Sequence, residues 1–301
     1  MSRFDDATPP PGLEPLLDAE AQRRADARAT EEFAIPSILL MERAGAEAAR
    51  LIDRRFPGLD ACVVVGGGNN GGDGMVVARH LAEAGRRVRV AVLADAPRRG
   101  DAGTMTQIAE RIGIPIDSAD DGLPSGGLLV DALLGTGARG APRGDHAQVI
   151  ARINDHPGPV VSLDVPSGVD AGTGAIEGVA VRATGTVTFG ADKVGLRVAP
   201  GRLMAGRVEV VRIGIPSAVR EAPSAWRGTA ALARSIPPKD PGGEKYGAGA
   251  VLVVGGSTGM TGAPALAARA AFRAGGGLVV AAIPGRVQPL VASAVPEAMV
   301  V

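Results

Sequence analysis

Apolar residues occur along the chain in two spacings that predict alternating strands and helices. Short continuous runs of Val and Leu are typical of strands covered on both faces, whereas apolar residues that return every three or four positions indicate amphipathic helices. The expected helices lie at residues 18–32, 37–54, 74–84, 104–112 and 147–154, and the expected strands at residues 63–65, 88–93, 128–133, 160–164, 185–189 and 208–213. This order predicts an α/β fold, a Rossmann-like three-layer αβα sandwich around a largely parallel sheet.

The regular apolar spacing ends after residue 216, where proline, glycine and charged residues take over. Residues 217–245 are therefore expected to form a linker, and the acidic, proline-rich residues 1–16 a flexible tail. A new strand–loop–helix pattern begins at residue 246, but the remaining stretch of about 55 residues is too short for an independent α/β core. We therefore expect one full domain at residues 17–216 and a partial second domain at residues 246–301.

The composition excludes several classes of function. The formal net charge is zero, so no overall field attracts nucleic acid or an anionic membrane. No apolar run approaches the roughly 20 residues of a membrane span, and the first residues do not resemble a targeting peptide. The single cysteine, Cys62, follows an alanine and precedes a valine run, as expected for a buried, unreactive thiol. We expect a cytoplasmic protein without nucleic-acid or membrane partners.

The first predicted strand is followed by the loop "GGGNNGGDG", residues 66–74. Its glycine spacing matches the dinucleotide fingerprint, and no Gly-Lys-Ser/Thr of a P-loop follows. However, Asp73 places a negative charge where a pyrophosphate would have to lie. Asp95, the candidate partner of a ribose, comes later than the usual position about 20 residues beyond the loop. The loop is better suited to a polar ligand or a cation held by side-chain amides and carboxylates.

Two further glycine-rich loops, "VDALLGTGARGAPRGD" and "LDVPSGVDAGTG", also follow predicted strands. Ligands of open α/β sheets bind beyond the carboxyl ends of the strands, so the three loops should converge there. Asp131 and Asp164 end their strands at this edge. Either could merely cap a turn, but two carboxylates at one edge are better explained as an acid–base group and a cation ligand. The histidines, His80, His146 and His156, are expected to be structural or at the surface.

In this order, "GGGNNGGDG", "VDALLGTG" and "VSLDVPSGVDAGTG" resemble the NAD(P)H-hydrate epimerase domain, and the resemblance extends over residues 17–216. The later stretch "KYGAGAVLVVGGSTGMTGAPALAARAAFRAGGGL" is similar to the start of an ADP-dependent NAD(P)H-hydrate dehydratase, a ribokinase-like domain. The two domains are commonly fused in a bifunctional nicotinamide-nucleotide repair enzyme. The resemblance implies an isomerase that interconverts the R and S forms of hydrated NADH and NADPH, named NADHX and NADPHX.

The resemblance also implies roles for individual residues. The substrate is expected to contact Asn69, Asn70, Gly71, Gly72, Asp73, Gly135, Thr136, Gly137, Ala138, Arg139, Gly140, Ala141 and Asp164. Asp164 is the expected catalytic residue, and a potassium ion is expected on Asn70, Asp131 and Ser167. Amide, carboxylate and hydroxyl oxygens suit such a hard cation, which would offset the carboxylate charge near an anionic nucleotide. Ala138 and Ala141 stand where the family frequently has bulkier residues.

The remaining expectations concern the second domain, assembly and alternative functions. ADP with Mg²⁺ would be a cofactor only of a complete dehydratase domain, so this chain as given is expected to lack dehydratase activity. The family implies a homo-oligomer. A non-catalytic nucleotide-binding or scaffolding module with the same fold is the main alternative, and an NAD-dependent oxidoreductase is a third. Inversion of the hydrated carbon by loss of hydroxide to an iminium, or by ring opening, stays open.

Overall fold

The computed structural model describes residues 12–93, 99–219, 221–235 and 240–301, and the chain divides into two compact units, Met1–Thr229 and Ala230–Val301. The helices are α1 Ala19–Glu31, α2 Ser37–Arg55, α3 Asn69–Glu83, α4 Gly100–Arg111, α5 Asp145–Asn154, α6 Gly201–Met204, α7 Gly262–Arg273 and α8 Gln288–Ala294. The strands are β1 Leu13–Leu17, β2 Ala61–Val65, β3 Val88–Val92, β4 Ile116–Ser118, β5 Leu128–Ala132, β6 Val160–Leu163, β7 Gly185–Phe189, β8 Asp192–Lys193, β9 Arg207–Val211, β10 Ala225–Gly228, β11 Ala250–Val254, β12 Leu278–Ala282 and β13 Met299–Val300.

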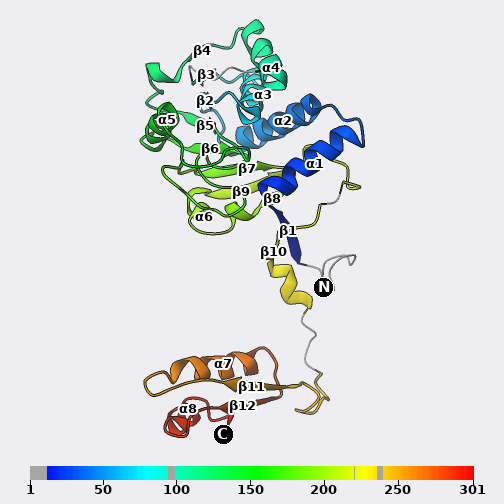
Figure 1. The fold of residues 1–301 in the computed structure, drawn as a ribbon, viewed down its shortest axis with the longest axis vertical. Coiled ribbons are helices and arrows are strands. Elements are labelled where there is room, and N and C mark those ends of the chain that lie inside the picture. Colours follow the sequence, from blue (N-terminus) through cyan, green and yellow to red (C-terminus); the bar gives the residue numbers. More distant parts are fainter. Residues whose placement is uncertain (1–11, 94–98, 220, 236–239) are drawn as a thin grey trace. The chain divides into compact units, whose positions relative to one another are not determined.

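The first unit is built on a seven-stranded sheet in the order β4-β3-β2-β5-β6-β7-β9, and every pair of neighbours is parallel. Successive residues of a strand face opposite sides of the sheet. Val63 and Val65 pack with buried residues of α2 and α3 on one side, and Cys62 and Val64 pack with α5 on the other (Figure 1). The structure therefore confirms the predicted three-layer α/β fold with a largely parallel sheet.

Helix α3 begins at Asn69 and not at residue 74, so the predicted boundary was wrong and most of the amide-rich loop is helical. Glycine is a poor helix former, but here it is required by close packing. A Cβ atom at Gly71 would lie 2.1 Å from the carbonyl oxygen of Gly66, and one at Gly74 would lie 2.7 Å from Cβ of Ala132. Tertiary packing therefore outweighs helix propensity, and it places Asn69–Asp73 on the first turns of α3.

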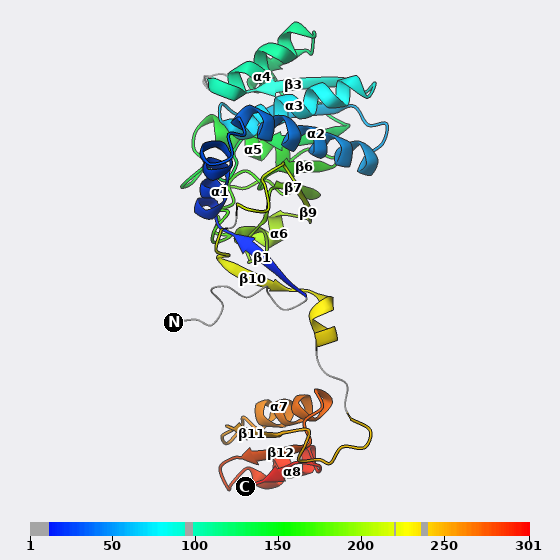
Figure 2. The same ribbon diagram turned by 90° about the vertical axis from the view of Figure 1, so that its right-hand side faces the viewer.

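A small second sheet, in the order β10-β1-β8, joins segments that are far apart in the sequence (Figure 2). Strand β1 lies largely within the expected tail and β10 within the expected linker, where they pair antiparallel from Leu13 with Gly228 to Leu16 with Ala225. On its other side β1 pairs with β8, which sets Leu17 beside Lys193. This sheet fixes β8 and the beginning of α1 next to the main sheet.

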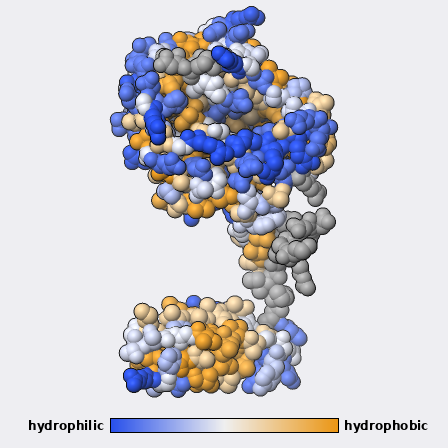
Figure 3. Space-filling view, in the orientation of Figure 1, coloured by the Kyte–Doolittle hydropathy of each residue, from blue (hydrophilic) through white to orange (hydrophobic). Residues whose placement is uncertain are grey.

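The second unit contains the parallel sheet β11-β12-β13 with α7 and α8. Its small core includes Ala268, Val279 and Val291. Strand β11 leaves most of its side chains exposed, with Val254 at 75%, and Figure 3 shows an apolar face on this unit. Among the residues that the structure describes, no helix combines the length and apolarity needed to cross a membrane.

Candidate functional site

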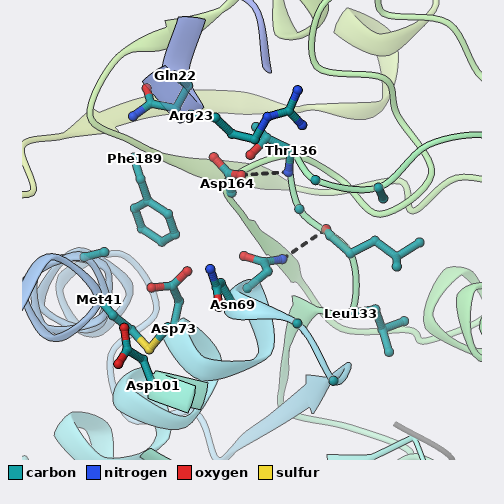
Figure 4. A pocket seen from close by; sticks show the side chains of 18 of the residues that line it. Gln22, Arg23, Met41, Asn69, Asp73, Asp101, Leu133, Thr136, Asp164 and Phe189 are labelled. Carbon is teal, nitrogen blue, oxygen red and sulfur yellow. Dashed lines mark hydrogen bonds between the residues drawn. The ribbon is translucent and has the colours of Figure 1, made fainter. Parts of the chain in front are cut away.

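A cavity of about 990 Å³ lies at the carboxyl ends of β2, β5 and β6 in the first unit. Its walls include residues of all three predicted loops, and α1 and α2 close it from the side through Gln22 and Met41 (Figure 4). The volume falls within the range typical of small-molecule sites. The structure thus brings the three loops together at one edge of the sheet, as their positions after parallel strands predict.

The cavity contacts some of the predicted substrate residues and not others. The members that line it are Asn69, Asn70, Asp73, Gly135, Thr136, Gly137, Ala138 and Asp164. The members that do not line it are Gly71, Gly72, Arg139, Gly140 and Ala141. Gly71 faces Gly66, and a Cβ at Gly72 would lie 2.7 Å from Sδ of Met41, so both glycines serve helix packing.

Asp164 directly follows β6 and is held in an unusual backbone conformation. Its φ angle is 65°, in the left-handed region that only Gly, Asn and Asp adopt readily. One carboxylate oxygen, Oδ2, accepts a hydrogen bond from the backbone N–H of Thr136 at 2.9 Å, and Oδ1 lies 2.9 Å from Nζ of Lys193. Such a conformation persists only where the surroundings fix it, so the carboxylate is held against the cavity.

Lys193 is the main residue of the site that the sequence analysis missed. Its side chain is fully buried, and besides the contact with Asp164 its Nζ donates to the carbonyl oxygen of Phe189 at 2.6 Å. A buried ammonium group needs such partners. The available signal was its rarity: the chain has three lysines, and only this one follows closely after an apolar strand.

Asp73 and Asp26 also lie at the cavity, from α3 and α1. Asp73 is buried, with 9% of the residue exposed, and no described residue forms a hydrogen bond or ion pair with its carboxyl group. Burial, and then the negative charges of Asp164 and Asp26, raise the pKa of Asp73 well above its usual value, although Lys193 acts in the opposite direction. Burial likewise raises the pKa of Asp26, against a hydrogen bond from Gln22.

Asp131 lies within β5 and does not line the cavity. Its carboxylate accepts four hydrogen bonds, from Ser162 Oγ at 2.8 Å, Ser167 N at 3.0 Å, Ser167 Oγ at 2.6 Å and Leu133 N at 3.3 Å. Burial raises the pKa of Asp131 and these donors oppose the rise. The Ser167 hydroxyl also accepts from the backbone N–H of Leu134 at 2.9 Å. Asp131 and Ser167 therefore tie the loop after β6 to the end of β5.

Asn70 is the predicted cation ligand whose oxygen is free. Its Nδ2 donates to the carbonyl oxygens of Leu134 and Leu163, at 3.0 and 3.3 Å, while its buried Oδ1 has no hydrogen-bond partner in the part of the chain that the structure describes. A buried oxygen without a donor suits a hard cation. The oxygens of Asp131 and Ser167, in contrast, are already engaged with N–H and O–H groups. Among the described residues, no three His, Cys, Asp or Glu side chains form a metal cluster.

Two arginine side chains also line the cavity, together with the acidic residues Asp101 and Asp145. Arg23 of α1 and Arg143 of the loop after β5 line it, and neither forms an ion pair with a described residue. His146 also lines the cavity, whereas the other histidines contact only protein groups: His80 lies 2.8 Å from Glu42, and His156 contacts backbone carbonyls. Asp95, the rejected ribose partner, lies outside the described residues. The guanidinium groups of Arg23 and Arg143 can bind phosphate groups.

Comparisons with known proteins agree with this geometry. The family model described as YjeF-related protein N-terminus matches residues 37–195. A bifunctional NAD(P)H-hydrate repair enzyme of Moorella thermoacetica is 43% identical over 94% of this chain and 57% of its own length, and one of Salinibacter ruber is 42% identical over 93% and 56%. The chain thus spans little more than half of these relatives.

An NAD(P)H-hydrate epimerase of Rhodopirellula baltica is 39% identical over 67% of this chain and 85% of its own length. The crystal structure of a yeast protein matches with a TM-score of 0.57 and 22% identity, over 65% of this chain and 87% of the yeast chain, which supports the fold. The chain belongs to the family of YjeF-related N-terminal domains, which includes NAD(P)H-hydrate epimerases.

Proposed function

We propose that the first unit interconverts the R and S forms of NADHX and NADPHX. One observation carries the proposal: three loops of the predicted kind surround a cavity in which the Asp164 carboxylate is fixed by Thr136 N–H and Lys193. The similarity to an NAD(P)H-hydrate epimerase over most of that relative's length supports the same activity. The free guanidinium groups of Arg23 and Arg143 would bind the phosphates of the dinucleotide.

The chemistry needs an acid–base group and a site that stabilises positive charge. In the hydrated ring one carbon carries both a hydroxyl group and the ring nitrogen, so its configuration can invert without oxidation or reduction. A fixed carboxylate can move a proton at this carbon, and its negative charge stabilises a cationic intermediate. Asp164 can supply both effects, because its contacts hold the carboxylate in place.

A direct assay tests the proposal. Purified protein is added to one resolved epimer of NADPHX, and the composition is followed by chiral separation. We expect both epimers to approach equilibrium at a rate that increases with enzyme concentration. An unchanged composition with folded protein would contradict the proposal, and calorimetric binding of the nucleotide under the same conditions would then favour a non-catalytic nucleotide-binding module.

A potassium ion beside Asn70 forms part of the proposal, with Asp131 and Ser167 as the further ligands that the family resemblance implies. The unpartnered Oδ1 of Asn70 supports it. When bound, the ion would supply positive charge near the nucleotide. The test compares thermal unfolding in potassium chloride and in tetramethylammonium chloride at equal ionic strength. We expect a higher Tm in potassium alone, and equal Tm values in both salts would remove the ion from the proposal.

The other parts of the proposal rest on the family. They are a homo-oligomeric assembly, a cytoplasmic location, and an ADP- and Mg²⁺-dependent dehydration of the hydrated nucleotides only where the second unit is complete. Incubation of the chain with NADPHX, ADP and Mg²⁺ tests this directly, because formation of NADPH is visible by absorbance. Light scattering on a size-exclusion column tests the assembly.

A further inference from the structure

The charge of the buried Lys193 ammonium group acts on three of the carboxyl groups that line the cavity. Asp26, Asp73 and Asp164 line the cavity from α1, α3 and the end of β6, whereas Lys193 of β8 contacts Asp164 without lining the cavity. If all three carboxyl groups were ionised, the single ammonium group of Lys193 could neutralise only one of them. Like charges in such a site favour the neutral form of one member. The contacts of each group indicate which one that is.

Lys193 contacts Asp164 and neither of the other carboxyl groups. Its Nζ lies 2.9 Å from Oδ1 of Asp164, and Thr136 N–H binds Oδ2. Both oxygens of Asp164 therefore face donors, which stabilise the ionised form. No cation and no hydrogen-bond donor among the described residues contacts the carboxyl group of Asp73, and burial raises its pKa. The contacts of Asp164 thus stabilise a negative charge there, whereas the burial of Asp73 without such contacts favours its protonated form.

The two carboxyl groups face the same space from different elements. Figure 4 shows Asp73 on α3 and Asp164 on the loop after β6, with Phe189 and Asn69 flanking the space between them. Phe189 lines the cavity at the end of β7 and presents a flat apolar surface suited to a nicotinamide ring. A ring bound there meets an unpartnered carboxylic acid on one side and a fixed carboxylate on another.

We propose that Asp73 is a second catalytic residue, the proton donor to the hydroxyl group of the hydrated ring, and that Lys193 is the positioning residue that keeps Asp164 as its anionic counterpart. This inference rests on the proposed function. It assigns the two carboxyl groups opposite roles, which is the arrangement expected when two titratable groups have different surroundings. It also selects the iminium route over ring opening, because a proton donor at the hydroxyl group promotes cleavage of the carbon–oxygen bond.

The steps balance in atoms and charge. Asp73 transfers its proton to the hydroxyl oxygen, and the carbon–oxygen bond breaks and releases water. The lone pair of the ring nitrogen forms the carbon–nitrogen double bond of the resulting iminium. The ionised Asp164 stabilises this cation. A water molecule then adds to the opposite face and gives a proton to Asp164, which restores the hydroxyl group with inverted configuration. Proton exchange through solvent returns Asp73 to the acid and Asp164 to the carboxylate.

The first test replaces Asp73 by Asn, which keeps the shape but cannot donate this proton. We expect kcat to fall by about 10²–10⁴, a change of KM of no more than a few-fold, and loss of the decline in rate at high pH. The groups that face Asp73 in the parent, namely Asp26, Asp164 and Lys193, determine where that decline lies. Asp117→Asn is the matched control, because Asp117 lies on β4 and binds Arg89 outside the cavity. A folded Asp73→Asn protein with parental kcat would overturn the inference.

The second test removes the charge partner of Asp164. Lys193→Met keeps an unbranched chain without charge, so the pH below which activity is lost should move upward, whereas Lys193→Arg should restore much of kcat. In the Asp164→Asn background, Lys193→Met should cause little further loss of kcat, since Lys193 acts through Asp164. Additive losses in this double-mutant cycle would overturn its positioning role. If Lys193→Met does not fold, Lys193→Arg and Asp73→Asn still decide the inference.

Oxygen exchange tests the route itself. In water enriched in ¹⁸O, the iminium route introduces one labelled oxygen with each inversion, and mass spectrometry of the newly formed epimer under single-turnover conditions detects it. Newly formed epimer without label would contradict the role of Asp73 while leaving the epimerase function intact. If the parent protein shows no inversion at all, the proposed function fails, and this outcome is distinct from failure of the inference.

Discussion

The neighbouring strands β5 and β6 both lead into an aspartate at the same edge of the sheet, yet the two carboxyl groups have different surroundings. Asp131 is fully buried and accepts four hydrogen bonds from the ends of both strands. Asp164 lines the cavity and contacts the only fully buried lysine among the described residues. An aspartate at a strand end is therefore structural when it is fully enclosed by its hydrogen-bond donors, and available for chemistry when it also faces a cavity.

The difference follows from one residue of register. Asp131 is still part of β5, and the pairing of β5 with β6 places its side chain beside that of Ser162, which donates a hydrogen bond to it. Asp164 comes one residue after β6, and its left-handed backbone turns it out of the strand. The pattern of the sequence is the same in both cases, but the place where pairing ends differs.

The largest effect on activity is expected at Asp164. Asp164→Asn keeps the size of the side chain and tolerates the left-handed conformation, so the fold and nucleotide binding should change little. The rate of epimerisation should fall by about 10²–10⁴, as is typical for loss of a general acid–base group. Chiral separation measures the rate and calorimetry measures binding. Parental turnover by this variant would show that the catalytic role of Asp164 is wrong even if the family assignment holds.

Asp131→Asn should instead lower the free energy of unfolding. In either orientation of the amide, the new NH₂ group would replace an oxygen that accepts two hydrogen bonds. It would face either Ser162 O–H and Ser167 N–H or Ser167 O–H and Leu133 N–H, and leave those donors unpaired. Each buried donor left unsatisfied costs about 1–3 kcal/mol, so we expect a loss of roughly 2–4 kcal/mol in the free energy of unfolding. Urea denaturation measures it. Unchanged stability, together with activity restored by added potassium, would identify Asp131 chiefly as a cation ligand.

Much of the fold could be predicted because local patterns determine it. Runs such as "ACVVV" predict strands and glycine-rich stretches predict the loops after them. The same pattern in "AVLVV" forms β11, which is largely exposed, because burial depends on the elements packed around a strand and not on its own sequence. The sheet β10-β1-β8 escaped prediction for a related reason, since its partners lie about two hundred residues apart in the sequence.

The site was predictable as far as strand ends determine it. The topology of a parallel sheet brings the three loops together, but it does not specify hydrogen bonds or charge partners. Lys193 was missed because a strand of two residues and a distant partner strand place it beneath Asp164. Asp73 was expected to contact substrate, and its lack of a hydrogen-bond or ion-pair partner among the described residues became visible only once the surrounding elements were in place.

A smaller effect is expected at Ser167. Ser167→Ala removes the hydroxyl group that donates to Asp131 and accepts from Leu134 N–H. Loss of the bond to Asp131 and of the acceptor for a buried N–H should cost about 1–3 kcal/mol in the free energy of unfolding, less than Asp131→Asn because the other donors to Asp131 remain. Urea denaturation provides the value. A loss larger than that of Asp131→Asn would mean that the hydroxyl group, and not the carboxylate, organises this strand end.

The last expected effect concerns the pH dependence of stability at Asp73. Because the folded state raises the pKa of Asp73, the folded protein binds its proton more tightly than the unfolded chain does. Its contribution to stability is therefore fully present below the unfolded value of about 3.9 and is lost as the pH rises through the folded value. Asp73→Asn has no proton to lose, so its free energy of unfolding relative to the parent should increase from pH 4 to pH 8. Each pKa unit of difference corresponds to about 1.4 kcal/mol.

Denaturation at several pH values gives the free energy of unfolding against pH for the parent and for Asp73→Asn. Parallel curves would mean that Asp73 is ionised in the folded protein. Unlike Asp164, it would then carry its charge without a partner among the described residues.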